Sequence, residues 1–301
     1  MKSPKVTVVI TTYNRPGLLE RAIRSVLNQT YENFECVVVD DCSSTHKPQE
    51  ITQKFTDNRV TYTRHEQNMG LSAARNTGIE HSDGEYVAFL DDDDVWKEKK
   101  LEKQIDLFER LEDKYAIVYC WMNYRRHTDE KIINEYCPSH DGNIFSKALE
   151  GQPIGSGSTL LVRRSIAKNT KFDVDIDRGI DGDFIRRVCQ EYYVDYVPEI
   201  LVEYYVEHGK DRITSQDESG IRDAISGHKI KFDKFSTELN AHPQCASRIL
   251  AKIAYHYAQL GEWRMSVKYY QKALSTSPTT VTVYRSILSS IKAGIDHYGH
   301  R

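Results

Sequence analysis

The sequence lacks any apolar run long enough to cross a bilayer. Its uninterrupted apolar stretches, such as residues 37–39 and 87–90, fall far short of the roughly 20 residues that a spanning helix requires. Lys2 and Lys5 resemble the start of a secretory signal, but polar residues interrupt the following stretch from Thr11 onward. We therefore expect neither a membrane-spanning segment nor a secretory signal.

Cysteine is scarce, and its spacing carries no binding pattern. The six cysteines include no CxxC pair, which argues against both a zinc knuckle and a disulfide framework. A reducing compartment is the simplest environment for such a chain, since disulfides persist mainly in oxidising ones. We therefore predict a cytoplasmic protein.

The chain has almost no net charge, because two unlike parts cancel. Residues 1–220 hold 29 Lys and Arg against 39 Asp and Glu, a net charge of −10. Residues 221–301 hold 12 against 5, a net charge of +7. Hydrophobic residues make up 39% of the chain, a globular composition that excludes global disorder. The asymmetry predicts two domains, with a boundary near residue 220.

Short β-rich runs alternate with helical patterns over the first hundred residues. Strands are expected at residues 5–11, 34–40, 60–65 and 85–91, with a helix in each interval. Such crossovers imply a mostly parallel sheet with helices on both faces, and thus an α/β fold. Further along, the pattern predicts a charged helix over 96–111, a helix over 181–191, and strands over 115–120, 159–162 and 194–197.

Polar clusters follow three of these strands. Residues 11–14 follow the first, Asp40 and Asp41 follow the second, and four aspartates, 91–94, follow the fourth. Ligands of parallel sheets bind at the carboxyl ends of the strands, so we expect the three clusters to share one edge. An aromatic face such as that of Tyr13 can stack on a nucleobase, and a carboxylate can accept from a ring N–H.

The four consecutive aspartates repel one another unless a cation or several hydrogen-bond donors are near. Carboxylate oxygens suit a hard ion, Mg²⁺ or Mn²⁺, which commonly bridges to phosphates. Each cluster also has a structural interpretation. Residues 91–94 could cap a helix near Trp96, Asp40 and Asp41 could form an Asx turn, and Tyr13 could be an ordinary aromatic at a strand end.

Taken together, the motifs resemble those of family 2 glycosyltransferases of the GT-A fold. The matching segments, over roughly residues 4–215, are VTVVITTYNRPGLLERAIRSVLNQTYENFECVVVDDCSS, NMGLSAARNTGIEHSDGEYVAFLDDDD, GIDGDFIRRV and VDYVPEILVEYYVEH. The resemblance implies transfer of a sugar from a nucleotide donor, usually a UDP-sugar, with inversion at the anomeric carbon. It also implies a divalent metal, Mn²⁺ or Mg²⁺.

The resemblance assigns the donor site to residues at the strand ends. Thr11 and Tyr13 match positions that line the base, with Tyr13 stacking on it, and Asp41 matches the carboxylate that reads the uracil N3–H. Arg75 lies in the matching ARN segment and could contact the donor, although a surface ion-pair role is equally open.

The resemblance also assigns different roles to the consecutive aspartates. Asp93 matches the metal ligand, Asp92 the ribose and sugar side, and Asp91 a supporting position. His208 matches a candidate ligand of the metal or diphosphate, and an exposed loop histidine is the alternative.

Asp181 matches the general base of the family. The usual Glu-Asp pair is here Ile180-Asp181, so one carboxylate that commonly helps to position the acceptor or the base is missing. Asp181 and Asp183 also lie where a helix is expected to begin, a position that favours acidic residues without any catalytic role.

After residue 220 the pattern is wholly helical. The stretch GEWRMSVKYYQKALSTSP resembles the second half of one tetratricopeptide unit, and a single helical hairpin is the simplest reading. The basic charge of residues 221–301 suggests that this segment docks to an anionic membrane surface at its cytoplasmic face or to a protein partner, although a basic helical face can also simply be solvated.

The expected activity is transfer of a sugar to a hydroxyl of a saccharide or lipid-linked saccharide in surface polysaccharide synthesis. Two alternatives use the same residues differently. A nucleotidyltransferase would also need metal-binding aspartates, but no Gly-rich phosphate loop follows the first strand. A scaffolding protein with a vestigial donor site would not need Asp41, Asp93 and Asp181 intact. No nucleic-acid partner is expected.

Overall fold

The computed structural model describes residues 4–176, 178–206, 218–278, 283 and 285–288. The chain divides into two compact units. The first comprises residues 1–145, 152–175 and 180–210, and the second comprises residues 146–151, 176–179 and 211–301. His208, the expected ligand of the metal or diphosphate, lies outside the described residues.

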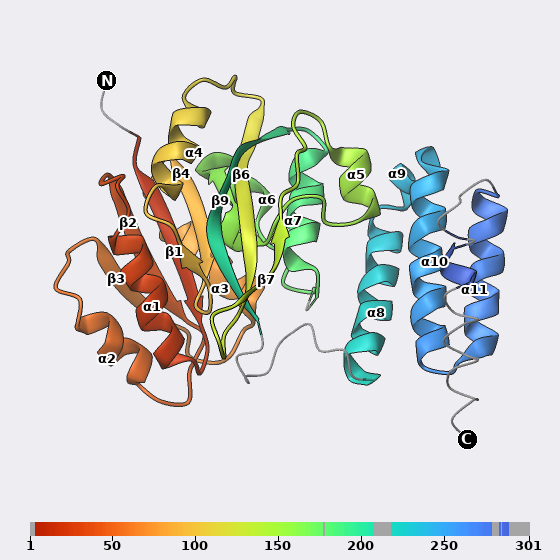
Figure 1. Ribbon diagram of the computed structural model, residues 1–301, viewed down its shortest axis with the longest axis horizontal. Helices are drawn as coiled ribbons and strands as arrows, with labels where there is room; N and C mark the ends of the chain where they lie inside the picture. The colour runs from red at the N-terminus through yellow and green to blue at the C-terminus, as the bar shows by residue number, and fades with distance from the viewer. Residues whose placement is uncertain (1–3, 177, 207–217, 279–282, 284, 289–301) are drawn as a thin grey trace. The chain divides into compact units, whose positions relative to one another are not determined.

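The first half of the sheet in the first unit is parallel, as the alternating pattern predicts. Its strands lie in the order β3-β2-β1-β4, and every neighbouring pair is parallel. Their bounds are β1 (Val6–Thr12), β2 (Phe34–Asp40), β3 (Val60–Arg64) and β4 (Tyr86–Asp91). The carboxyl ends of these four strands therefore meet at one edge of the sheet (Figure 1).

The second half of the sheet is mixed. Antiparallel β8 joins β4 to β6, β9 runs parallel to β6, and short β5 pairs antiparallel with β9. Strand β7 pairs with β6 only, as the other arm of a hairpin. These strands are β5 (Val95–Trp96), β6 (Tyr115–Arg126), β7 (Ile132–Tyr136), β8 (Leu161–Arg163) and β9 (Tyr193–Val206).

Helices cover both faces of this sheet. On one face α1 and α4 bury Leu19, Ile23 and Ile105 against alternate residues of β1, β2 and β4. On the other face α3 packs on β1 and β2, while Phe89 of β4 contacts the stacked rings of Phe172 and Phe184. The helices are α1 (Pro16–Leu27), α2 (Lys47–Gln53), α3 (Leu71–Glu80), α4 (Lys100–Phe108), α6 (Arg164–Thr170) and α7 (Ile180–Cys189).

The second unit is helical, as expected for the C-terminal segment. Helices α10 and α11 form the predicted hairpin, in which Gly261 provides the positive φ of +72° that its turn requires. Ala254 of α10 and Ala273 of α11 lie fully buried between them, which lets the two backbones approach closely. The helices are α8 (Glu218–Lys234), α9 (Ser236–Ala241), α10 (Pro243–Gln259) and α11 (Trp263–Thr276), with residues of α5 (Phe145–Glu150) also in this unit.

Some predicted boundaries were wrong where strands pair over a long distance. The helix expected from residue 96 begins at Lys100, because Trp96 belongs to β5 and pairs with Val202. The strands expected at 115–120 and 194–197 extend to Arg126 and Val206, because the two strands pair with each other up to those residues. Among the described helices, none combines the length and the apolar character needed to span a bilayer.

Lys100 is a fully buried lysine at the start of α4. Its Nζ donates to Gln104 Oε1 at 2.7 Å and lies 3.9 Å from the centroid of the Trp96 ring. Burial lowers the pKa of Lys100 to about 8, against an opposing effect of Cys120. The charged form of Lys100 therefore costs free energy in the folded protein that the unfolded chain does not bear.

We predict that the free energy of unfolding rises as this lysine loses its proton. Between the folded-state pKa of about 8 and the ordinary pKa of 10.5, Lys100 is protonated in the unfolded chain but has lost its proton in the folded protein. Rising pH in this interval therefore favours the folded state. In the wild type, this effect raises the free energy of unfolding by about 2 kcal/mol between roughly pH 7.5 and 9.5, and the substitution Lys100→Met should abolish that rise. Urea unfolding of both proteins at the two pH values measures this rise, and an equal pH dependence in the two would contradict the assignment.

Candidate functional site

The predicted polar clusters do meet at the carboxyl edge of the parallel strands. In the sheet register Thr11 pairs with Asp91 of β4, and Thr12 pairs with Asp40 of β2. The Thr12 hydroxyl donates to Asp92 at 2.7 Å. Thr11 is buried, whereas Tyr13 is 46% exposed beyond the strand end, where its ring is open to a ligand.

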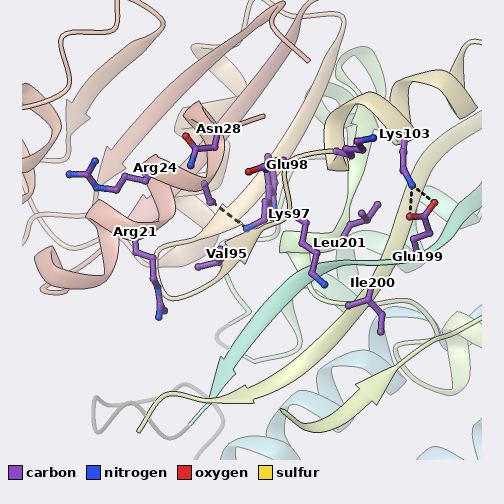
Figure 2. Close-up of a pocket in the computed structure, with 13 residues that line it drawn as sticks. Arg21, Arg24, Asn28, Val95, Lys97, Glu98, Lys103, Glu199, Ile200 and Leu201 are labelled. Carbon is purple, nitrogen blue, oxygen red and sulfur yellow. Dashed lines mark hydrogen bonds and ion pairs between the residues drawn. The ribbon is translucent and has the colours of Figure 1, made fainter. Parts of the chain in front are cut away.

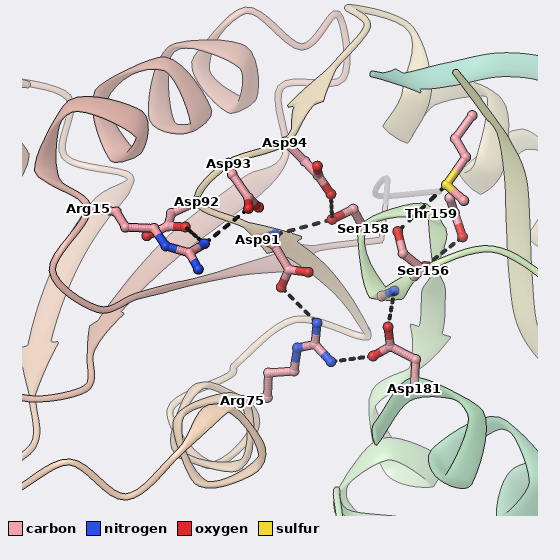
Figure 3. Close-up of polar contacts among 12 residues, drawn as sticks. Arg15, Arg75, Asp91, Asp92, Asp93, Asp94, Ser156, Ser158, Thr159 and Asp181 are labelled. Atoms are coloured by element: carbon pink, nitrogen blue, oxygen red, sulfur yellow. Dashed lines mark hydrogen bonds and ion pairs between the residues drawn. The ribbon is translucent and has the colours of Figure 1, made fainter. Parts of the chain in front are cut away.

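The four aspartates point to different partners (Figure 3). Arg15, in the loop after β1, donates to Asp92 at 3.2 Å and to Asp93 at 3.0 Å. Asp94 is fully buried and accepts from Ser158 Oγ at 2.6 Å and from the backbone N–H of Tyr205 at 3.2 Å. Asp94 therefore has a structural role, while Asp92 and Asp93 face a cation.

The crowding of these carboxylates disfavours their charged forms. Burial, together with the neighbouring charge of Asp93, raises the pKa of Asp92 to about 7, against the opposing effect of Arg15. Burial also raises the pKa of Asp94 well above its ordinary value and raises that of Asp91. An added positive charge at this edge would therefore be stabilised.

Arg75 of α3 links the aspartate run to Asp181. Its guanidinium donates to Asp91 at 2.7 Å and forms a second ion pair with Asp181 at the start of α7 (Figure 3). The alternative that the sequence left open, a surface ion pair, was wrong only in its location: Arg75 forms ion pairs, but it is 1% exposed. Although burial opposes it, the nearby carboxylates of Asp181 and Asp91 raise the pKa of Arg75, which stays charged.

A close backbone approach completes the setting of Asp181. The N–H of Gly157 donates to Asp181 Oδ2 at 2.9 Å, and a Cβ at position 157 would lie 2.6 Å from a terminal nitrogen of Arg75. Any larger residue at position 157 would therefore require the Arg75 guanidinium to shift. Asp183, the second acidic residue at the start of α7, accepts from Arg187 at 2.8 Å. The two aspartates thus differ in role, because only Asp181 faces the aspartate run.

Asp41 lies in a ring of hydrogen-bond donors after β2. It accepts from His65 Nδ1 at 2.7 Å and from the backbone N–H groups of Met69 and Gly70, each at 2.8 Å. The sequence interpretation missed both His65 and Arg15. Arg15 could have been identified from its position in the matched stretch TTYNRP, beside the expected base-binding residues. Nothing in the sequence distinguished His65 from other histidines.

The site offers a minimal set of ligands for a hard cation. Within the part of the chain that the structure describes, no group of three or more His, Cys, Asp and Glu side chains is arranged to hold a metal ion. Asp91 and Asp93 nevertheless present carboxylate oxygens at an edge where positive charge is stabilised, and the Arg15 guanidinium already supplies such a charge to Asp93. These residues fit Mg²⁺ or Mn²⁺ bound mainly through phosphate oxygens and water.

A pocket of about 750 Å³ lies between α1, β5, α4 and β9 (Figure 2). None of the predicted site residues lines it. Lys103 and Glu199, which both line the pocket, form an ion pair with each other. Arg21, another lining residue, donates to the backbone carbonyl of Asp93 at 2.7 Å and so connects the pocket to the aspartate run. The charged residues that line the pocket are Arg21, Arg24, Lys97, Lys99, Lys103, Glu98 and Glu199.

We predict that Arg75→Met destabilises the protein by about 3–5 kcal/mol, because Asp91 and Asp181 would lose the cation that compensates them. Arg15→Met should cost less, since the Arg15 side chain is 23% exposed and water can replace part of its contacts. Adding Asp181→Asn to Arg75→Met should restore part of the stability. Chemical denaturation of the three variants measures this, and equal losses for Arg75→Met and Arg15→Met would contradict the central role of Arg75.

Comparison with known proteins agrees with this geometry. The model of a family described as "Glycosyl transferase family 2" matches residues 7–170. The putative colanic acid biosynthesis glycosyl transferase WcaA of Escherichia coli K12 is 30% identical over 238 residues, which cover 78% of this chain and 85% of WcaA.

Two solved structures share the fold. S. aureus TarS 1–349 in complex with UDP-GlcNAc has a TM-score of 0.65 at 16% identity, covering 96% of this chain and 89% of that one. The mannosyltransferase PcManGT of Pyrobaculum calidifontis, in complex with GDP-Man and Mn²⁺, has a TM-score of 0.59 at 19% identity, covering 98% and 88%. The expected GT-A fold is confirmed by these likenesses. With the family model matching more than half of its residues, the chain belongs to glycosyltransferase family 2.

Proposed function

We propose that the protein transfers a sugar from a UDP-sugar to a hydroxyl of a saccharide or lipid-linked saccharide, with inversion, in surface polysaccharide synthesis. The observation that carries this proposal is the shared guanidinium of Arg75, which holds Asp181 and Asp91 around one point. In this proposal Asp181 as the base and the edge at Asp91 as the diphosphate site would act on a single sugar. The complex of TarS with UDP-GlcNAc supports a UDP-sugar as the donor, and the name of WcaA, which refers to colanic acid biosynthesis, supports a role in polysaccharide synthesis.

Asp181 is the proposed general base. Its carboxylate, 17% exposed, would take the proton of the acceptor hydroxyl as that oxygen forms a bond to the anomeric carbon. The bond from the anomeric carbon to the diphosphate oxygen breaks on the opposite face, and UDP leaves. Arg75 and the Gly157 N–H fix the carboxylate, so that its orientation does not depend on the substrate.

Asp93, with Asp91 beside it, is the proposed holder of Mn²⁺ or Mg²⁺. When bound, such an ion neutralises charge on the leaving diphosphate. The ion in PcManGT supports a divalent metal here, and the carboxylates of this chain are the hard ligands that such an ion prefers. Arg15 pairs with Asp93 and would have to share it with the ion.

The nucleoside is proposed to lie over the ends of β1 and β2. Tyr13 would stack on the base, buried Thr11 would line its pocket, and Asp41 would accept the N–H of uracil. Asp92, which is held by Thr12, would face the ribose and the sugar.

The basic C-terminal segment is still proposed to bind a membrane surface or a protein partner. Part of its charge is used internally, since Lys229 donates to the Tyr257 hydroxyl at 2.8 Å and Arg222 pairs with Glu218 and Glu262. Exposed Arg264 and Lys268 on α11 are candidates for such contacts. A cytoplasmic location belongs to the same proposal.

Asp181→Asn should keep donor affinity and lose at least about a hundredfold in transfer rate, the usual contribution of a general base. The reason is that Asp181 acts on the acceptor and not on the diphosphate. Sugar transfer and binding of UDP measure the two effects separately. Asp183→Asn is the matched control at the start of the same helix, and normal transfer by Asp181→Asn would overturn the assignment.

Asp93→Asn should lose most metal-dependent activity, because the amide removes the charged oxygen that the ion requires. Asp94→Asn, one residue away, should retain it, since Asp94 is bound to Ser158 and to the backbone of Tyr205. Release of UDP from a panel of UDP-sugars, with Mn²⁺ and with a chelator, measures both variants. Equal activities in the two variants would contradict a metal role specific to Asp93.

A further inference from the structure

His65 is a buried histidine that contacts Asp41 and touches none of the residues proposed for the chemical step. It follows β3, its side chain is 9% exposed, and its two ring nitrogens bind Asp41 and the hydroxyl of Thr77 on α3. We propose that His65 is a positioning residue that sets the choice of nucleobase by leaving Asp41 a single open acceptor site. This inference rests on the proposed binding of a uridine nucleotide at Asp41.

The hydrogen bonds of Asp41 can be counted. An ionised carboxylate has about four acceptor positions. Oδ1 accepts from His65 Nδ1 and from the N–H of Met69, and Oδ2 accepts from the N–H of Gly70. One position therefore remains, on Oδ2. The Asp41 side chain is 6% exposed, and a ligand that donates a hydrogen bond to it would have to use this remaining position.

The ring of His65 is itself oriented from both sides. Because an ionised carboxylate only accepts, Nδ1 carries a hydrogen toward Asp41, and Nε2 forms a hydrogen bond of 2.8 Å with the Thr77 hydroxyl. The backbone N–H of His65 also donates to the carbonyl of Asp40 at 2.9 Å. The donor to Asp41 is thus held in place by two contacts, one to α3 and one to the end of β2.

The chain on either side of Asp41 is equally constrained. Cys42 has a φ of +63°, an uncommon conformation for a residue other than glycine, and Gly70, which donates to Asp41, has a φ of +86°. Such conformations persist where surrounding contacts fix them. The open position on Oδ2 consequently has a fixed direction, which is what discrimination between bases requires.

The neighbouring carboxylate provides a contrast. Asp40 is 0% exposed and accepts from the Tyr62 hydroxyl at 2.7 Å, from Arg64 at 2.9 Å and from the N–H of Ser43 at 2.9 Å. It has as many donors as Asp41 but no accessible edge. Asp40 is therefore a structural carboxylate, and its bond from Tyr62 matches the length of the bond from His65 to Asp41.

An open acceptor position distinguishes uracil from cytosine. Uracil presents an N3–H donor, whereas N3 of cytosine is an acceptor that would face the carboxylate with like polarity. If His65 is removed, a position opens on Oδ1, so the carboxylate then has two open positions and can rotate between them. The penalty on cytosine then falls, while binding of the diphosphate at the aspartate run is unchanged.

The test compares UDP and CDP binding by calorimetry in four proteins: wild type, His65→Leu, His65→Asn and Tyr62→Phe. His65→Leu should reduce the ratio of UDP to CDP affinity by about tenfold, as expected for one hydrogen bond to a charged group. His65→Asn should keep most of the ratio, because its amide can donate from near the Nδ1 position. Tyr62→Phe should keep it as well.

The outcomes separate the two proposals. A wild-type protein that binds UDP and CDP equally contradicts the proposed uridine site itself. A wild-type preference that His65→Leu retains overturns the role of His65 alone, and so does an equal loss of preference in Tyr62→Phe, which would mean general loosening. If His65→Leu does not fold, Thr77→Val gives the decision, since it frees the ring at Nε2 and should lower the same ratio.

Discussion

One buried guanidinium holds the candidate active site together. Arg75 pairs with a carboxylate at the end of β4 and with another at the start of α7, at a separation of 106 residues from Asp181. Any of the three charges buried alone would be costly, because the interior cannot replace its hydration. Paired, they fix the sheet edge and the helix to each other, and an enzyme that moves a sugar between two substrates depends on that fixed distance.

The four aspartates after β4 show how one acidic run serves several purposes. Asp91 belongs to the Arg75 bridge, Asp92 is tied to Thr12, Asp93 faces Arg15, and Asp94 is a buried anchor. The division comes from the backbone, which turns after the strand and sends successive side chains in different directions. Substituting one aspartate is therefore not equivalent to substituting its neighbour, although the residue type is the same.

The sequence was sufficient for the parallel half of the sheet and for the edge where its polar residues meet. Each of those strands is a short β-rich run whose side chains alternate between two covered faces, and such a pattern is local. The strand β5 and the long arms of β6 and β9 were not predictable from local patterns. Paired residues of β6 and β9, such as Arg126 and Val206, are 80 positions apart, and Val95 of β5 is 108 positions from its partner Glu203.

The same distinction applies to the site. Residues at or just after strand ends could be placed at the edge, namely Tyr13, Asp41, Asp91, Asp92 and Asp93. The partners could not be placed, because nothing near His65 or Arg15 in the chain reveals which carboxylate each one faces. The assignment of chemical roles to these residues stays a prediction, whereas their proximity is a structural fact.

The anchoring of Asp94 has a consequence for how the protein is made. Its two donors are Ser158 and the backbone N–H of Tyr205, so a carboxyl group from the first third of the chain finds its last partner 111 residues later. A ribosome releases the N-terminal strands first, and these can pair among themselves as they emerge. The anchor of Asp94, however, stays incomplete until β9 has been synthesised and lies beside β6. Asp94 therefore gains its last partner only after nearly the whole first unit has left the exit tunnel, and a chain that terminates before Tyr205 lacks this anchor of the aspartate run.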